Sequence, residues 1–271
     1  MLGLNKFYID ESVNFMKENI PDNFVDLTVT SPPYDDLRVY NGFKFDYKSV
    51  LNELQRITKD GGIVVWVVGD KTKNGSETLT SFEHALYAKE IGFNVHDTMI
   101  YAKNNPVPQV DKSRYTQSFE YMFVLSKGKP KTVNRIMIDC LHKGVVHKGK
   151  NKLNEENIDR KIDRAVKDKK PLANIWYYNI GTNQSCTDKF GSKHPAIFPE
   201  ELAKDHILTW SNEGDIVFDP MCGSGTVCKM AYLNNRNFIG VDMSKEYIEE
   251  ICEPRLKEFG WDNTYKELKL S

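Results

Sequence analysis

Short apolar runs rich in β-branched residues alternate along the chain with stretches whose apolar residues recur at helical spacing. Residues 63–68 are apolar throughout, which is the pattern of a strand buried on both faces. They follow residues 47–58, where apolar side chains three and four positions apart would share one face of a helix. Strands that alternate with amphipathic helices favour an α/β fold with a mainly parallel sheet.

The same pattern predicts the order of the elements and one irregular stretch. Strands are expected at residues 7–9, 24–30, 63–68, 94–102, 121–125, 215–218 and 237–241. Helices are expected at residues 13–19, 47–58, 81–92, 199–210, 226–234 and 245–259. From residue 127 to about residue 175, charged residues dominate and no period is clear, so we expect an insertion there.

Composition bounds the class of protein. The 271 residues are enough for one large domain, or for one domain with an inserted part. No run approaches the roughly 18 apolar residues of a membrane span, and Asn5 and Lys6 interrupt the N-terminal apolar residues, so we expect no signal peptide. The five cysteines form no Cys-x-x-Cys pair and the histidines no His-Glu-x-x-His pattern. We therefore expect reduced thiols, a cytoplasmic protein and no metal site.

Charge is unevenly distributed along the chain. The formal net charge is -1, yet residues 127–170 contain 14 Lys and Arg against 6 Asp and Glu. A local basic patch is what contact with nucleic-acid phosphates requires. A solvated, lysine-rich surface is the alternative interpretation of such a stretch.

A glycine-containing string follows the strand predicted at 215–218. It reads Asp-Pro-Met-Cys-Gly-Ser-Gly over residues 219–225, and glycines at such a turn allow positive φ and a close backbone approach to a ligand. The next strand is followed by Asp242, which can accept both hydroxyls of a ribose; a helix N-cap is its alternative role. Cys228 stands where a dinucleotide fingerprint has its third glycine, which counts against a nicotinamide-dependent oxidoreductase. The string therefore predicts a nucleoside cofactor.

A proline pair follows the strand predicted at 24–30. Pro32 and Pro33 fix two φ angles and remove two backbone donors, so that nearby carbonyls can face a ligand. An exocyclic amine has two hydrogens to place, and the Ser31 hydroxyl with a prolyl carbonyl can accept both. Tyr34 offers a ring on which an extruded base can stack. A rigid loop is the alternative for this string alone, but together with the glycine string it predicts transfer of a group to a base amine.

These motifs, in this order, resemble those of the circularly permuted, β-group DNA amino-methyltransferases. Members of that family use S-adenosylmethionine (AdoMet) and belong to restriction-modification systems and their relatives. The resemblance covers nearly the whole chain: residues 25–34 are similar to the catalytic motif and residues 218–226 to the AdoMet loop. The order, with the catalytic motif first, is what defines the permuted group. Further similar segments are residues 118–121, 174–176 and 194–200.

The resemblance implies roles for individual residues. It makes Ser31, Pro32, Pro33 and Tyr34 catalytic. The implied AdoMet site comprises Asp10, Thr30, Asp219, Pro220, Cys222, Gly223, Gly225, Thr226 and Asp242. Within it, Asp10 would contact the adenine, Asp219 would orient the loop or contact the cofactor amine, and Thr226 would cap the following helix. A helix cap is the alternative role for Asp10. His194 would either contact the ligand or make a structural hydrogen bond.

The resemblance also implies a fold and partners. The fold would be a Rossmann-like methyltransferase domain with a mixed seven-stranded sheet flanked by helices, built from residues 1–126 and 171–271. Residues 127–170 fall where such enzymes carry target recognition, and Lys143, Lys148, Lys150 and Lys152 would contact double-stranded DNA. A homodimer and a separately acting restriction endonuclease are left open, and the recognition sequence has no readable code. The protein would be prokaryotic or phage-encoded.

The residue at position 31 bears on the target base. In this family Ser-Pro-Pro-Tyr is associated with cytosine N4, and adenine N6 is the alternative because some enzymes with this motif modify it. Methylation of cytosine C5 needs a thiolate, usually in a Pro-Cys dipeptide, and the chain has none. The intact motifs disfavour a non-catalytic DNA-binding module, while RNA and protein substrates stay open. We expect direct transfer to a flipped base, carried by positioning and electrostatics, without a covalent enzyme intermediate.

Overall fold

The chain divides into two compact units. The computed structural model describes residues 2–33, 45–108, 113–153, 158–181, 184–191 and 197–262, with the backbone alone at 147–153 and 158–164. The larger unit comprises Met1–Asn134 and Asn174–Ser271, and the smaller unit is Arg135–Ala173.

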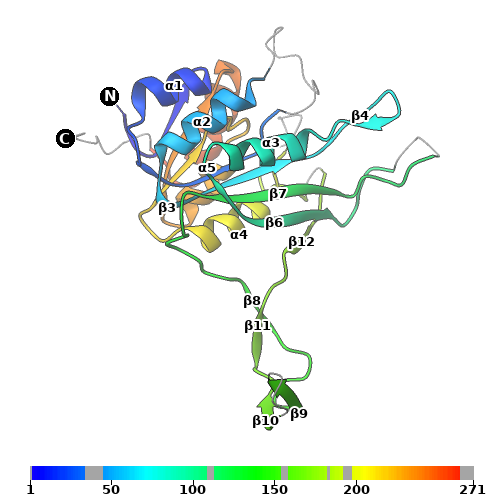
Figure 1. Cartoon of the computed structure of the whole chain (residues 1–271). Helices are drawn as coiled ribbons and strands as arrows, with labels where there is room; N and C mark the ends of the chain where they lie inside the picture. The colour runs from blue at the N-terminus through cyan, green and yellow to red at the C-terminus, as the bar shows by residue number, and fades with distance from the viewer. Residues whose placement is uncertain are drawn as a thin grey trace. The chain divides into compact units, whose positions relative to one another are not determined.

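An eight-stranded sheet forms the centre of the larger unit over its described residues (Figure 1). Its order is β1-β14-β13-β2-β3-β7-β6-β12, and every neighbouring pair is parallel except the two formed by β7. The strands are β1 Lys6–Ile9, β2 Val25–Thr30, β3 Thr58–Val68, β6 Asn94–Lys103, β7 Phe119–Ser126, β12 Ile175–Tyr178, β13 Ile216–Asp219 and β14 Asn237–Asp242. The predicted α/β class is confirmed, and the structure adds β12 at one edge to the seven predicted strands.

Helices lie on both faces of this sheet (Figure 1). They are α1 Ser12–Asn19, α2 Tyr47–Ile57, α3 Thr80–Glu90, α4 Glu200–Trp210, α5 Thr226–Leu233 and α6 Glu253–Lys257. The single helix predicted at 245–259 is instead a π-helical segment, η2 Tyr247–Cys252, followed by α6. Pro254 has no N–H to donate to the preceding turn, which interrupts α-helical hydrogen bonding there. Among the described residues, no helix is long and apolar enough to cross a membrane.

One continuous apolar core explains why the strongest sequence patterns form the elements they predict. Residues 63–68 of β3 are at most 1% exposed, because helices cover both faces of this central strand. The apolar face of α2 packs into the same core through Val50, Leu51, Leu54 and Ile57. Asp46 caps this helix by accepting hydrogen bonds from two backbone N–H groups of its first turn.

Over its described residues, the smaller unit consists of two antiparallel strand pairs. β8 Met137–Asp139 pairs with β11 Lys169–Pro171, and β9 Val146–Leu153 pairs with β10 Ile158–Ala165. No strand was predicted there, because these segments lack the apolar alternation by which strands are recognised. In the larger unit, β4 Thr72–Lys73 and β5 Ser76–Glu77 form a further hairpin around Asn74-Gly75, whose positive φ angles suit a two-residue turn.

Gly240 on β14 provides a test of packing between the sheet and α5. A Cβ atom at this position would lie 2.6 Å from the Cys228 sulfur and 2.8 Å from a ring carbon of Phe7. Both neighbours are buried, so Gly240→Ala is expected to lower the free energy of unfolding by about 1–3 kcal/mol. Urea denaturation measures this difference. Adding Cys228→Ala should recover part of the loss, and an unchanged midpoint for the single variant would contradict the packing argument.

Candidate active site

The carboxyl ends of four neighbouring strands lie side by side at one end of the sheet. β1, β14, β13 and β2 are neighbours and all parallel, so the residues at their carboxyl ends lie side by side. The register pairs Ile9 with Asp242 and Asp219 with Gly240. The Asp10 N–H donates to the Asp242 carbonyl over 3.1 Å. Three aspartates that are distant in sequence therefore lie close together at the carboxyl ends of these strands, namely Asp10, Asp219 and Asp242.

The glycine loop, residues 222–225, folds back on the end of β14. The Cys222 N–H donates to that strand over 2.9 Å, and the Gly223 N–H donates to the Asp242 carboxylate over 2.8 Å. Gly223 and Gly225 have φ angles of 51° and 71°, which glycine adopts without steric cost. A Cβ atom on Gly225 would approach the Cys252 sulfur to 3.0 Å, so packing as well as backbone conformation favours glycine.

The glycine loop leads directly into α5, whose N-cap residue is Gly225. The prediction that Thr226 caps this helix is therefore wrong. Thr226 is the first residue of the helix, and its hydroxyl accepts a hydrogen bond from the Arg255 guanidinium over 2.9 Å. A glycine in the left-handed region can take the cap position, which leaves the threonine hydroxyl for a tertiary contact.

Two carboxylates at this edge shape the turns that follow their strands. Asp242 accepts from the Gly223 N–H with one oxygen and from the Ser244 N–H, at 2.8 Å, with the other. Asp10 accepts from the Glu11 N–H at 2.7 Å, but the N-cap residue of α1 is Glu11 itself. Neither aspartate is a helix N-cap, so that alternative role is excluded for both.

A buried hydrogen bond joins the glycine-loop strand to the strand that precedes the proline pair. The Thr30 hydroxyl donates to the Asp219 carboxylate over 2.9 Å, across 189 positions of sequence. The same carboxylate oxygen accepts from the Met221 N–H. Asp219 is 4% exposed, and burial raises its pKa to about 7. Near neutral pH this aspartate is therefore protonated in a large fraction of molecules.

The Ser31-Pro32-Pro33-Tyr34 motif begins directly after Thr30. Ser31 and Pro33 are half-buried and Pro32 is buried, so the start of the motif is packed against the sheet edge. Tyr34 lies outside the described residues, as does His194. Pro220, at the start of the other motif, is buried.

The thiols around the glycine loop are packing groups. Cys222, Cys228 and Cys252 are buried, and burial raises the pKa of each thiol. They are therefore neutral at physiological pH. The Cys252 thiol donates to the Gly223 carbonyl over 3.1 Å. The buried Cys222 side chain therefore packs against the protein interior.

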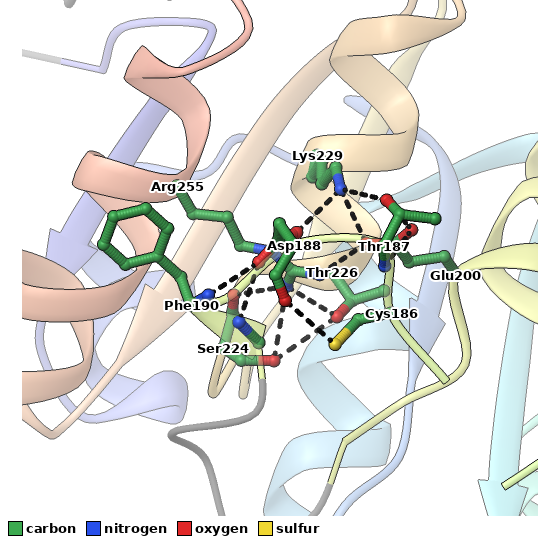
Figure 2. Close-up of polar contacts among 10 residues, drawn as sticks. Cys186, Thr187, Asp188, Phe190, Glu200, Ser224, Thr226, Lys229 and Arg255 are labelled. Carbon is green, nitrogen blue, oxygen red and sulfur yellow. Dashed lines mark hydrogen bonds and ion pairs between the residues drawn. The ribbon is translucent and has the colours of Figure 1, made fainter. Parts of the chain in front are cut away.

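A charged cluster that was not predicted lies next to the same loop (Figure 2). It comprises Asp188, Glu200, Lys229 and Arg255, all of them buried or nearly so. The sequence held one signal for it: Lys229 interrupts an otherwise apolar face of the helix predicted at 226–234. The other members come from separate parts of the chain, and no local pattern relates them.

The lysines predicted to contact DNA belong to the smaller unit. Lys143 is exposed. Lys148, Lys150 and Lys152 are residues of β9, and the backbone register places them opposite Asp163, Lys161 and Asp159 of β10. The prediction for these residues stays a prediction.

The loops at the carboxyl ends of these strands fit AdoMet as a nucleoside cofactor. Two positive-φ glycines let the backbone come close to a ligand. Asp10 directly follows β1, and Asp242 ends the adjacent strand β14. Both carboxylates are half-buried and are acceptors for amino and hydroxyl hydrogens. In the described part of the chain, no group of three or more His, Cys, Asp or Glu residues is arranged to hold a metal ion.

Known proteins resemble the chain over most of its length. The DNA methylase family, described by an N6/N4 methyltransferase model, matches residues 25–253. The orphan methyltransferase M.BamHII of Bacillus amyloliquefaciens is 56% identical over 249 residues, which cover 90% of this chain and 93% of that protein. The type II methyltransferase M.BglII of Bacillus subtilis is 26% identical, with 98% of this chain and 73% of the relative covered.

Solved structures share the fold. TTHA0409 of Thermus thermophilus in complex with S-adenosyl-L-methionine superposes with a TM-score of 0.62 at 21% identity, covering 96% of this chain and 98% of that one. The cytosine-N4-specific PvuII DNA methyltransferase gives a TM-score of 0.66 at 17% identity, covering 93% and 90%.

The family, the fold class and the cofactor predicted from sequence are thereby confirmed. The chain belongs to the N6/N4 DNA methylase family, and it is an AdoMet-dependent DNA methyltransferase.

Proposed function

We propose that the enzyme methylates the exocyclic N4 amino group of a cytosine flipped out of duplex DNA. The observation that carries this proposal is the buried Thr30–Asp219 hydrogen bond, which fixes the start of the Ser31-Pro32-Pro33 motif beside the strand that bears the glycine loop. Ser31 supports cytosine N4 because a neutral hydroxyl is enough to orient that amine. The family model includes both N4 and N6 methylation, so adenine N6 is the second candidate for the same site.

In this proposal the catalytic work is positioning. The Ser31 hydroxyl and the Pro32 carbonyl accept the two hydrogens of the amine, which directs the nitrogen lone pair toward the cofactor. Pro33 and Tyr34 flank the base, and Tyr34 stacks on its ring. When bound, AdoMet supplies an electrophilic methyl group on a sulfonium sulfur. The amine proton leaves to solvent after transfer, so no strong general base is required.

The proposed AdoMet site uses the backbone more than side chains. Gly223 and Gly225 bring main-chain groups to the cofactor, Asp242 accepts the ribose hydroxyls, and Asp10 faces the adenine. The other predicted members act by holding this backbone in place. They are buried in the structure: Thr30, Asp219, Pro220, Cys222 and Thr226.

The proposed DNA-contacting region is the basic stretch 127–170. In our proposal Lys143, Lys148, Lys150 and Lys152 neutralise phosphates, which makes affinity fall with rising salt. The excess of 14 basic over 6 acidic residues in that stretch supports this assignment. Recognition of the DNA sequence and contact with phosphates would then be provided by a region of the chain separate from the loops proposed to bind AdoMet and the base.

The experiment that tests the proposal is mass spectrometry of nucleosides from DNA methylated with isotope-labelled AdoMet. The expected product is labelled N4-methylcytosine. Labelled N6-methyladenine would keep the site and overturn the argument from Ser31. Label that appears only in RNA or protein, supplied in parallel reactions, would overturn the proposed substrate.

Ser31→Ala is expected to lower kcat by about tenfold or more, because one hydrogen bond that orients the amine is lost. AdoMet affinity should be unchanged, since this hydroxyl belongs to the base side of the site. Single-turnover kinetics and isothermal titration with AdoMet separate the two effects. Ser76→Ala, in the exposed β4–β5 hairpin, is the control. A loss of AdoMet affinity equal to the loss in kcat would contradict this division of roles.

Asp242→Asn is expected to weaken AdoMet binding by about ten- to a hundredfold, because one oxygen that accepts hydrogen bonds is replaced by an amide nitrogen that cannot accept them. Isothermal titration measures this affinity directly. The control is Glu246→Gln, which makes the same charge change at an exposed position four residues later. Unchanged AdoMet affinity in Asp242→Asn would remove this carboxylate from the cofactor site.

A further inference from the structure

Four buried charges form a closed ring next to the glycine loop (Figure 2). The side chains of Lys229 and Arg255 are 1% and 0% exposed, and those of Asp188 and Glu200 are 4% and 6% exposed. Lys229 Nζ lies 2.8 Å from Asp188 Oδ2 and 2.6 Å from Glu200 Oε1. Arg255 reaches the same two oxygens over 2.7 Å each, with Nε and Nη2. Two cations thus alternate with two anions, and the ring has no net charge.

The remaining oxygens of both carboxylates are also satisfied. Asp188 Oδ1 accepts from two backbone N–H groups, those of Phe190 and Gly191, at 2.9 Å each. Glu200 Oε2 accepts from the N–H and the hydroxyl of Thr187. Burial alone would raise the pKa of Asp188, but hydrogen bonds from Lys229, the Gly191 N–H and Arg255 lower this pKa well below its usual value. Asp188 is therefore ionised at physiological pH.

Stability alone is a weak explanation for this ring. Burying charges costs several kcal/mol per ion, and apolar residues of similar volume often serve stability as well or better. Such a ring tolerates only one arrangement of its members, because each charge must keep its partners. Its members come from four separate places, namely the 184–191 loop, α4, α5 and α6, so it fixes these segments against one another.

One edge of Arg255 faces away from the ring and toward the glycine loop. Its Nη1 donates to the Ser224 carbonyl over 2.8 Å and to the Thr226 hydroxyl over 2.9 Å. Ser224 stands between the two positive-φ glycines of the loop. Glycine has the widest range of backbone conformations, so a loop with glycines on both sides of Ser224 needs an external contact to hold one of them.

We propose that Arg255 is a positioning residue that holds the glycine loop in its AdoMet-binding conformation, and that the buried ring holds Arg255. A guanidinium is planar and has five N–H donors in fixed directions, so fixing Nε on Asp188 and Nη2 on Glu200 also aims Nη1. Lysine places one ammonium on a flexible stem, so at this position it does not reproduce the fixed directions of the guanidinium donors. The inference rests on the proposed assignment of the loop to the cofactor.

The test compares Arg255→Lys with Arg236→Lys. Arg236 is a matched control because it is also buried, at 8% exposed, and also donates to backbone carbonyls, those of Ser211 and Asn234, without contact to the glycine loop. Hydrogen exchange of the peptide covering residues 222–226 is measured without AdoMet, and AdoMet affinity is measured by isothermal titration. We expect both variants to lose thermal stability.

Only Arg255→Lys should speed exchange in the loop peptide and weaken AdoMet binding, each by about tenfold or more. Wild-type values for either quantity, or equal changes in Arg236→Lys, would overturn the proposal. If Arg255→Lys does not fold, Thr226→Val removes one acceptor of the same arginine and leaves the ring intact. It should then show faster loop exchange, and unchanged exchange would overturn the proposal.

The two proposals fail in different ways. Loop exchange without cofactor reports only on the contact between Arg255 and the loop. If Asp242→Asn leaves AdoMet affinity unchanged while Arg255→Lys speeds loop exchange, the assignment of Asp242 fails and the positioning contact stands. If Asp242→Asn weakens AdoMet binding and Arg255→Lys leaves loop exchange unchanged, the site stands and the inference about Arg255 fails.

Discussion

The pairing of β13 with β2 is the constraint on which the arrangement of the two motifs depends. These strands come from opposite ends of the chain, and their parallel register brings Thr30 close enough to donate to Asp219 over 2.9 Å. Because both groups are buried, this hydrogen bond has no competition from water and is costly to break. The two motifs that define the enzyme therefore meet at a place set by the sheet and not by either loop.

The glycine loop combines residues of high conformational freedom with contacts that restrain its backbone. The glycine loop has two residues with positive φ, which permits close approach of its backbone to a ligand. Its conformation is then restrained from several directions: Asp242 accepts from Gly223, the Cys252 thiol donates to the Gly223 carbonyl, and Arg255 donates to the Ser224 carbonyl. A preorganised loop loses less conformational entropy on binding, which favours affinity.

Periodicity predicted much of the fold because the strongest patterns are also the most deeply buried. Residues 63–68 formed part of β3 and the helix predicted at 47–58 formed α2, since both pack into one apolar core. β12 was missed, because it is a four-residue edge strand with alternating exposure. The strands of the smaller unit were missed because apolar alternation does not mark them. The break between η2 and α6 depends on Pro254 within a segment whose apolar spacing suggested a continuous helix.

The sequence by itself determined the family, the fold class and the cofactor, because those depend on short strings such as Ser31-Pro32-Pro33 and Gly223-Ser224-Gly225. It did not determine how these loops are held. Tertiary structure alone joined Thr30 to Asp219, gave the helix cap to Gly225 and gave the Thr226 hydroxyl to Arg255. It also assembled the ring of Asp188, Glu200, Lys229 and Arg255 from four segments. Long-range polar contacts leave no periodic trace in a sequence, because they depend on distances that exist only once the chain has folded.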